Sequence, residues 1–293
     1  MRILITGGTG FIGDHLIKEI SEVNQILLLT RNLDNREENN VHCIYGDLGE
    51  ISTFDEKVIN FNPDVLVHLA WQDIPDYSEE TSYLNLINSI SLIKFILKKT
   101  SCKKIIISGS CFEYGKLFGS CNEKDKVKIN NYFAWAKNSL YDYVSVMTSE
   151  LNINLVWFRI FYVFGKGQMS KSIIPYLTES IRNRKLPNVM YPNNKNDFIY
   201  VKDVARFFDH AIKHNIKSGI YNLGSGNSTP IYELVRFISE YFDNKKLLEN
   251  FNVGDSSAKS DFWASMEKTK QVFKLDLEYD YKSGIKDYLK QLS

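Results

Sequence analysis

The sequence is poor in cysteine, has no long apolar run and carries almost no net charge. Its four cysteines show no C-x-x-C spacing, which argues against a zinc site and a disulfide framework. The longest apolar runs are strand-sized and fall far short of the roughly 20 residues that cross a bilayer. The 36 basic and 35 acidic side chains leave a net charge of +1, so neither nucleic acid nor an acidic membrane is expected as a partner.

An export leader is also not recognised, because the sequence opens directly on an apolar strand and a glycine turn. Together with the few cysteines, this predicts a cytoplasmic protein that holds no metal. The 293 residues are 44% hydrophobic and 24% charged, a composition typical of a globular protein with one large domain or two modest ones.

Apolar runs alternate with amphipathic stretches through the first 165 residues, as in a parallel sheet built from βαβ units. Strands are expected at residues 2–6, 25–30, 41–45, 64–69, 104–108 and 154–160, and helices at 11–21, 83–99 and 132–151. The strands are apolar throughout, which indicates helices on both sheet faces. The predicted fold class is α/β, a Rossmann-type doubly wound parallel sheet.

The regular alternation weakens after Gly165. Helices are expected near 172–184, 204–214 and 231–241, between segments rich in glycine, proline and asparagine. We therefore expect a larger domain at 1–165, to which 197–225 return, and a smaller, irregular C-terminal lobe formed by 166–196 and 226–293.

A glycine turn joins the first strand to the first helix. Gly7, Gly10 and Gly13 follow the pattern G-x-x-G-x-x-G, with Phe11 and Ile12 between the last two. Glycine lets the backbone turn sharply and approach a pyrophosphate, whose charge then meets free N–H groups at the start of the helix. The turn predicts a dinucleotide-binding domain, with these five residues at the cofactor.

The end of the second strand indicates which dinucleotide is bound. An acidic residue there would accept hydrogen bonds from the ribose 2′-hydroxyl and repel a 2′-phosphate. This strand ends in Thr30-Arg31-Asn32, and the first acid after it is Asp34. Arg31 can pair with a 2′-phosphate, so NADP(H) is favoured over the alternative, NAD(H).

Several motifs occur in an order that resembles the extended short-chain dehydrogenase/reductase family, in its NAD-dependent epimerase/dehydratase type. They are TGGTGFIG at 6–13, Asp47-Leu48, His68-Leu69-Ala70, Asn85, Ser110 with Tyr114-Gly115, Arg159 with Val163-Phe164-Gly165, DFIYVKDV at 197–204 and YNLGSG at 221–226. The resemblance implies a nucleotide-sugar enzyme that holds the sugar in its C-terminal lobe. It also implies that Asp47 and Leu48 contact the adenine and that Leu69 and Ala70 line the cofactor.

The family's reaction centre combines a serine or threonine with Tyr-x-x-x-Lys. The resemblance assigns Ser110 to the sugar oxygen at C4, and Lys137 to the nicotinamide ribose and to lowering the pKa of the tyrosine. The tyrosine position lies one helical turn before Lys137, on the same face, but it holds Phe133. Phenylalanine fills the space of the ring but has no proton to give, so we expect an impaired enzyme.

Three interpretations of Phe133 stay open. It can be an engineered replacement of the catalytic tyrosine, or the protein can be a non-catalytic member of the family. Alternatively, Tyr132 serves as the acid through a local helix distortion, although its position lies about 100° around a regular helix.

The resemblance also narrows the reaction. Family dehydratases carry Asp-Glu directly after the catalytic serine, where this chain has Cys111-Phe112. The segment resembles that of bacterial 4-keto-6-deoxysugar reductases, such as the CDP-abequose synthase and dTDP-6-deoxysugar 4-reductase groups. We therefore expect NADPH-dependent reduction of a C4 keto group in surface-polysaccharide synthesis, for example of lipopolysaccharide. The alternatives are a 4-epimerase that retains NAD and a non-catalytic NADP(H) sensor.

The substrate is expected to be a nucleotide-diphosphate sugar whose base the sequence leaves open. Candidate substrate contacts are Trp71, Ser110, Cys111, Phe112, Tyr162, Lys166, Gln168, Tyr191, Asn196 and Lys259. A homodimer is also expected, because the helices at 83–99 and 132–151 carry more apolar surface than one sheet face needs, and in the family these helices pair across a two-fold axis.

Overall fold

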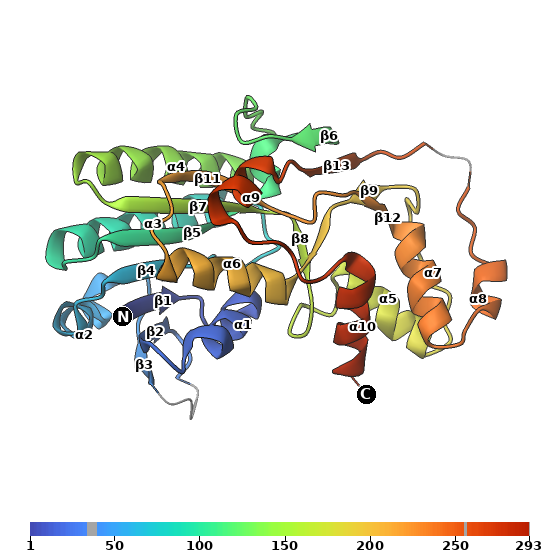
Figure 1. Ribbon diagram of the computed structural model, residues 1–293, viewed down its shortest axis with the longest axis horizontal. Helices are drawn as coiled ribbons and strands as arrows, with labels where there is room; N and C mark the ends of the chain where they lie inside the picture. Colours follow the sequence, from blue (N-terminus) through green and yellow to red (C-terminus); the bar gives the residue numbers. More distant parts are fainter. Residues whose placement is uncertain (34–39, 255–256, 293) are drawn as a thin grey trace.

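A seven-stranded parallel sheet forms the centre of the computed structural model, which describes residues 1–33, 40–254 and 257–292 (Figure 1). Its strand order is β11-β7-β5-β4-β1-β2-β3. The strands are β1 Arg2–Thr6, β2 Gln25–Thr30, β3 Val41–Tyr45, β4 Val65–His68, β5 Lys104–Ser110, β7 Asn154–Ile160 and β11 Gly219–Leu223. The order reverses between β1 and β4, and ligands of doubly wound sheets bind at the carboxyl ends of strands at such a point.

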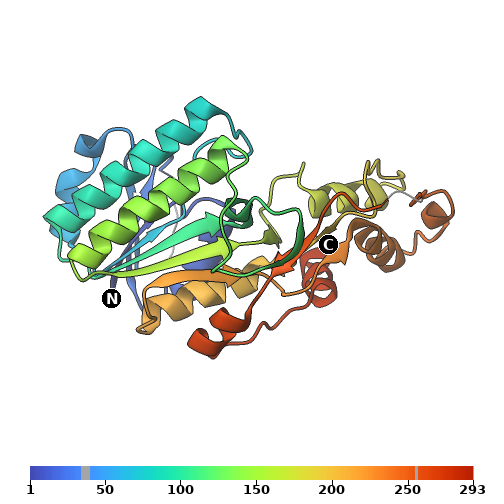
Figure 2. The ribbon, with the colours of Figure 1, turned by 90° about the horizontal axis from the view of Figure 1, so that it is seen from above.

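Helices cover both faces of this sheet. The helices are α1 Phe11–Ile20, α2 Asp55–Phe61, α3 Glu79–Lys99, α4 Tyr132–Glu150, α5 Ile173–Arg182, α6 Val201–Lys213, α7 Ile231–Tyr241, α8 Lys246–Glu249, α9 Glu267–Phe273 and α10 Tyr281–Lys290. Figure 2 shows α3 and α4 side by side over one face, with α6 on the other. None of the helices in the described ranges is both long and apolar enough to cross a membrane.

Each strand of the sheet contributes to two separate cores. Ile3 and Ile5 pack with residues of α1 and α6, whereas Leu4 between them packs with residues of α3 and α4. Successive side chains of a strand point to opposite faces of the sheet. Where helices cover both faces, the side chains on both faces must therefore be apolar. This confirms the predicted fold class, a Rossmann-type α/β fold with a smaller C-terminal lobe.

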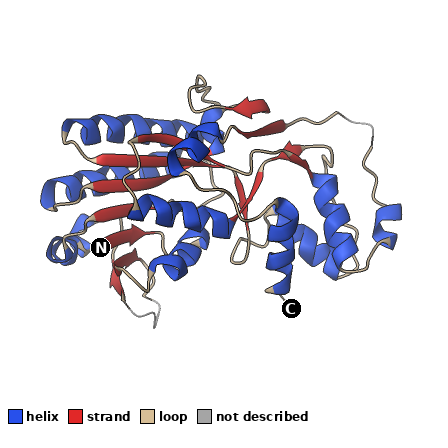
Figure 3. Cartoon of the chain, in the orientation of Figure 1, coloured by secondary structure: helices blue, strands red, loops and turns tan. Residues whose placement is uncertain are grey.

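The C-terminal lobe lies beyond the carboxyl ends of the strands, where Figure 3 shows several helices and short strands. Helices α5, α7 and α10 share a core of their own, which includes Leu177, Leu234 and Ile285. The short strands are β6 Phe118–Cys121, β8 Tyr162–Phe164, β9 Lys195–Asn196, β10 Phe198–Tyr200, β12 Thr229–Pro230 and β13 Asp261–Ala264. Residues 219–223 return to the large sheet as β11. The exact division at 165, 196 and 225 stays a prediction.

One pairing in the smaller sheets links distant parts of the chain. Strand β13 runs parallel to β6, with Ala264 opposite Cys121. Asn222, at the end of β11, donates hydrogen bonds to the carbonyls of Cys121 (2.7 Å) and Ser265 (3.1 Å). The hydroxyl of Tyr114 donates to the Asn222 side chain at 2.6 Å. The segment after β5 is therefore held by residues near position 265.

Candidate active site

The glycine turn brings the first helix close to the end of β4. Gly7 has φ = +73°, and a Cβ atom there would lie 2.6 Å from the backbone nitrogen of Ala70. A Cβ atom at Gly13 would lie 2.3 Å from the carbonyl oxygen of Gly7. Only glycine satisfies both positions, because neither contact leaves room for a side chain. Gly10 caps α1 without a side chain, so Phe11, Ile12 and Gly13 present backbone N–H groups at the helix start.

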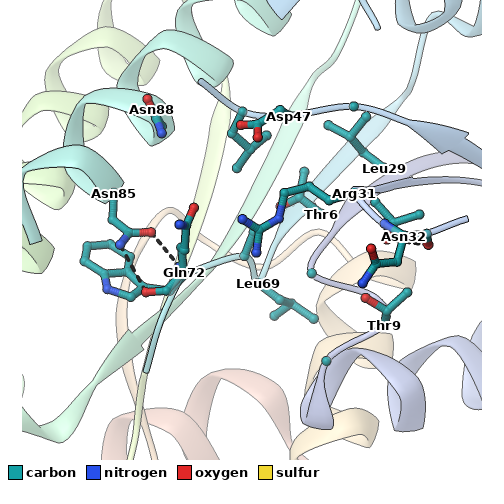
Figure 4. A pocket seen from close by; sticks show the side chains of 17 residues that line it. Thr6, Thr9, Leu29, Arg31, Asn32, Asp47, Leu69, Gln72, Asn85 and Asn88 are labelled. Carbon is teal, nitrogen blue, oxygen red and sulfur yellow. Dashed lines mark hydrogen bonds between the residues drawn. The ribbon is translucent and has the colours of Figure 1, made fainter. Parts of the chain in front are cut away.

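A cavity of about 290 Å³ lies against this turn, at the switch between β1 and β4 (Figure 4). Its lining includes seven residues that the sequence analysis assigns to the cofactor, namely Gly7, Gly10, Arg31, Asp47, Leu48, Leu69 and Ala70. Trp71 and Gln72 line it as well. Asn85 of α3 holds Gln72 in place, accepting from its backbone N–H (2.6 Å) and donating to its carbonyl (3.2 Å).

Arg31 extends over this cavity. Thr30 fixes the turn that presents it, because its hydroxyl donates to the carbonyl of Asn32 (3.0 Å) and accepts from the Asn32 N–H (3.2 Å). Figure 4 shows the Arg31 side chain directed toward Gln72 and away from Asn32. Within the described residues the Arg31 guanidinium has no ion pair or hydrogen bond, and Asp34 lies outside them. Free helix N–H groups and a turn without side chains together fit the pyrophosphate of a dinucleotide, and Arg31 adds a cation that has no partner among the described residues.

Lys137 extends from α4 to the indole ring of Trp71, one of the residues that line the cavity. Its Nζ donates to the carbonyl of Ser108 at 2.8 Å and lies 3.9 Å from the ring centroid of Trp71. The side chain is buried, and burial lowers the pKa of Lys137 to about 7, while the carboxylate of Glu113 opposes the shift. Burial and the Lys137 charge also lower the pKa of His68, to about 3, so this imidazole is neutral. Lys137 can therefore exchange a proton near neutral pH.

Ser110 ends β5 and caps the short helix at Cys111–Tyr114. Its hydroxyl accepts from the N–H of Phe112 (3.2 Å), and its own N–H donates to the Glu113 carboxylate (2.7 Å). Glu113 is itself buried in an ion pair with Arg159, at 2.7 Å. The ion pair holds the Glu113 carboxylate in place, and that carboxylate in turn holds the backbone N–H of Ser110.

Phe133 lies in a cluster of five aromatic side chains, here called the aromatic cluster: Trp71, Tyr77, Phe112, Phe133 and Tyr162. Its ring centroid is 5.4 Å from that of Trp71, 4.9 Å from that of Tyr77 and 6.2 Å from that of Phe112. Phe112 in turn lies 6.2 Å from Tyr162. The structure thus brings together three predicted substrate residues around position 133. Tyr77 was not foreseen, because its separation in sequence from Phe133 follows no motif.

Tyr132 points elsewhere. It is 50% exposed, whereas Phe133 is 5% exposed, as expected for neighbouring residues on different faces of a regular helix. Tyr132 lines a second cavity with Glu79, Tyr83 and Trp135, formed by α3, α4 and the segment before α4. Its ring has no contact with the aromatic cluster among the described residues.

Cys111 is buried near two members of the aromatic cluster, Tyr77 and Tyr162. Burial, together with the nearby Cys121 and Asp197, raises the pKa of the Cys111 thiol well above its usual value of 9.0. The thiol therefore stays protonated near neutral pH, which is unfavourable for a nucleophile.

The remaining predicted substrate residues lie in the C-terminal lobe or at its edge. Lys166 is exposed, and its carbonyl contacts the His15 ring at 2.8 Å. Gln168 donates to the carbonyl of Val163 at 2.9 Å, and Asn196 is buried in β9. Two others pair with each other: Lys259 Nζ donates to the Tyr191 hydroxyl at 2.9 Å. These contacts do not extend to the aromatic cluster, so a role for these five residues in substrate binding stays a prediction.

Comparison with known proteins identifies the family. Residues 3–224 match the NAD dependent epimerase/dehydratase family. The chain belongs to this family, whose nucleotide-sugar enzymes include epimerases, dehydratases and reductases.

Two characterised relatives act on deoxysugars linked to dTDP. The chain is 27% identical to the dTDP-6-deoxy-L-talose 4-dehydrogenase (NAD(+)) of Aggregatibacter actinomycetemcomitans, over 86% of this chain and 94% of the relative. It is also 27% identical to the dTDP-4-dehydro-6-deoxyglucose reductase of Escherichia coli, over 85% of this chain and 84% of the relative. The solved UDP-N-acetylglucosamine 4-epimerase of Bacillus cereus has the same fold, with a TM-score of 0.84, 19% identity, and coverage of 100% of this chain and 96% of that one.

Proposed function

We propose that this chain reduces the C4 keto group of a nucleotide-linked deoxysugar with NADPH, in the cytoplasmic synthesis of a bacterial surface polysaccharide. The proposal depends mainly on one observation, which is that the cavity at the glycine turn lies close to two cationic side chains, Arg31 and Lys137. Arg31, which has no partner among the described residues, lines the cavity, and Lys137 lies beside Trp71, which lines it as well. The two dTDP-deoxysugar relatives support a reaction at C4.

The residues at the glycine turn would hold the cofactor. The N–H groups of Phe11, Ile12 and Gly13 would bind the pyrophosphate, Asp47 and Leu48 would contact the adenine, and Arg31 would bind the 2′-phosphate. When bound, NADPH supplies a hydride to the carbonyl carbon. One observation favours NAD(H) instead: the relative from Aggregatibacter is named for NAD(+).

The chain's own residues would stabilise the reacting oxygen. Ser110 would donate a hydrogen bond to the sugar oxygen at C4, and Lys137 would bind the nicotinamide ribose. Phe133 occupies the tyrosine position and offers only its ring. The expected impairment therefore holds only if no other side chain supplies the proton.

The nucleotide sugar would extend from the aromatic cluster into the C-terminal lobe. Trp71, Phe112 and Tyr162 would face the sugar, with Cys111 near Tyr162. The diphosphate and the base would meet residues of the lobe, for which Lys166, Gln168, Tyr191, Asn196 and Lys259 are the candidates.

The test is an assay of cofactor oxidation with 4-keto-6-deoxysugars linked to dTDP, CDP, UDP or GDP, with NADPH and NADH in parallel. Faster oxidation of NADPH with one of these sugars is expected. Interconversion of UDP-sugars at C4 without net cofactor consumption would instead identify a 4-epimerase. Cofactor binding without turnover, even after Phe133→Tyr, would identify a sensor.

We also propose a homodimer through the outer surface of α3 and α4. Tyr83, Leu84 and Ile87 of α3 are 52%, 51% and 40% exposed, and Val146 of α4 is 59% exposed. Apolar side chains gathered on adjacent helices are typical of a subunit interface. Light scattering should give twice the monomer mass at micromolar concentration, and a monomer there would contradict the proposal.

A further inference from the structure

Tyr77 has the one phenol whose ring contacts Phe133 among the ring contacts of the described residues. Its ring centroid lies 4.9 Å from that of Phe133 and 5.8 Å from that of Phe112. The residue precedes α3 by two positions, in the loop that follows β4, and so reaches the cluster from a different element than Phe133 of α4. A phenol ring thus packs against the position where the family's tyrosine is missing.

The loop that carries Tyr77 is fixed by side-chain hydrogen bonds on its C-terminal side. Asp76 accepts from the N–H of Ser78 at 2.9 Å and from the hydroxyl of Thr81 at 2.6 Å. Ser78 in turn caps α3 by accepting from the Thr81 N–H at 3.4 Å. Because both neighbours of Tyr77 are tied to the first turn of a long helix, its backbone is held in place.

The electrostatic surroundings place Tyr77 within the site. Burial raises the pKa of Tyr77, and the nearby Cys111 raises it further. Burial also raises the pKa of Tyr162, and Cys111 and Tyr77 add to that shift. The three groups therefore lie near one another, and Tyr77 keeps its proton at neutral pH. At 36% exposed, Tyr77 also retains contact with solvent, from which a proton can return.

We propose that Tyr77 is a catalytic residue, which donates the proton that Phe133 cannot supply. This rests on the proposed reductase function. As hydride from NADPH forms the new C–H bond at C4, the π electron pair of the C=O bond moves to the oxygen. That oxygen takes the proton of Tyr77, the O–H bond of the phenol breaks, and the phenolate regains a proton from solvent. The net change consumes NADPH, one proton and the ketone, and gives NADP⁺ and the alcohol.

A double-mutant cycle with Phe133→Tyr tests this role. Tyr77→Phe should lower kcat by on the order of 10²–10⁴-fold, with a KM for the keto sugar changed only a few-fold, because the ring and its packing remain. In the Phe133→Tyr background the same Tyr77→Phe change should cost less than about tenfold, since the acid is then at its family position. Tyr241→Phe, which changes a tyrosine of α7 that is 38% exposed, is the matched control and should leave kcat unchanged.

Nitration gives a readout that does not depend on turnover. Tetranitromethane should nitrate both Tyr77 and Tyr132 in the free protein, as peptide mass spectrometry can resolve. NADP⁺ together with dTDP-4-dehydro-6-deoxyglucose should protect Tyr77 and leave Tyr132 reactive, because only Tyr77 would be covered by the sugar.

The outcomes separate this proposal from the proposed function. Unchanged kcat in Tyr77→Phe, equal nitration of Tyr77 with and without the ligands, or loss of activity in Tyr132→Phe would each overturn the role of Tyr77. An inactive parent chain that becomes active on Phe133→Tyr would also overturn the role of Tyr77. That result would still support the reductase function. Absence of keto-sugar reduction by both the parent and Phe133→Tyr would overturn the reductase function, and the role of Tyr77 with it.

Discussion

The cofactor end and the reacting end of the candidate site are built in different ways. At the cofactor end, the turn after β1 depends on backbone geometry: Gly7 and Gly13 are required because the chain passes too close for a Cβ atom. At the reacting end, Lys137, Phe133 and Tyr77 meet through side chains from separate elements. A backbone turn tolerates little change, whereas a side-chain function can move to another element that reaches the same space. The cofactor end retains the family pattern, and the reacting end departs from it.

Gly7→Ala should have the largest effect and disable the cofactor end. The positive φ costs roughly 1–2 kcal/mol for any L-residue with a side chain, and forcing Cβ against the Ala70 backbone adds about 1–3 kcal/mol. Gly119→Ala is the matched control, because Gly119 has φ = +86° but no atom within 4 Å of its Cβ position. Urea unfolding should show the larger loss in Gly7→Ala, with dinucleotide binding lost only there. Equal losses in the two variants would show that the close approach is unimportant.

Lys137→Met should change the pH dependence of the free energy of unfolding. The size of this change tests whether Lys137 is buried at the reacting end as the structure shows. An unfolded lysine has its usual pKa of 10.5, and burial lowers the folded value to about 7. The cost of burying the charge is fully present below pH 7 and disappears as the pH rises toward 10.5. Between these values, the stability of the parent relative to the variant should therefore increase by about 1.4 kcal/mol per pH unit.

The measurement is urea unfolding of the cofactor-free proteins at several pH values between 6 and 9. His68 does not obscure the result because it is neutral throughout, and Glu113, whose pKa burial raises, is present in both proteins that are compared. The exposed Lys98→Met is the control and should show no such slope. A parent-minus-variant difference that does not vary with pH would mean that Lys137 is hydrated in solution.

Arg31→Ala should have the smallest effect, limited to cofactor selectivity. Loss of the guanidinium should weaken NADP⁺ binding by roughly 1–3 kcal/mol, the size of a charge-assisted hydrogen bond, and leave NAD⁺ binding nearly unchanged. Calorimetric titration of both dinucleotides into both proteins gives the four affinities required. If NADP⁺ and NAD⁺ weaken equally, the assignment of the 2′-phosphate to Arg31 is wrong.

The sequence predicted the part of the molecule that local patterns determine. The turn at Gly7 lies between a strand and a helix as expected, and Phe133 and Lys137 share a buried helix face while Tyr132 does not. Local patterns also placed the start of α3 four residues too late, because the helix begins at a cap on Ser78 rather than at the apolar stripe.

Contacts between distant segments could not be predicted in this way. Tyr77 meets Phe133 only because the loop after β4 and the start of α4 lie at the same edge of the sheet. The pairing of β6 with β13 joins residues near 120 and 263, and neither segment has a strand pattern long enough to recognise. Such contacts depend on the topology of the whole sheet and not on any local spacing.

The pairing of β6 with β13 also has a consequence for synthesis on the ribosome. Strands β1, β2 and β4 and helix α1, which build the cofactor end, are all made within the first 70 residues. The segment after Ser110 acquires its supports only when residues 261–265 have emerged, because Cys121 and Asn222 bind there. In a nascent chain, the elements around the glycine turn are therefore complete long before those around Ser110. We expect cofactor binding to become possible earlier in synthesis than catalysis.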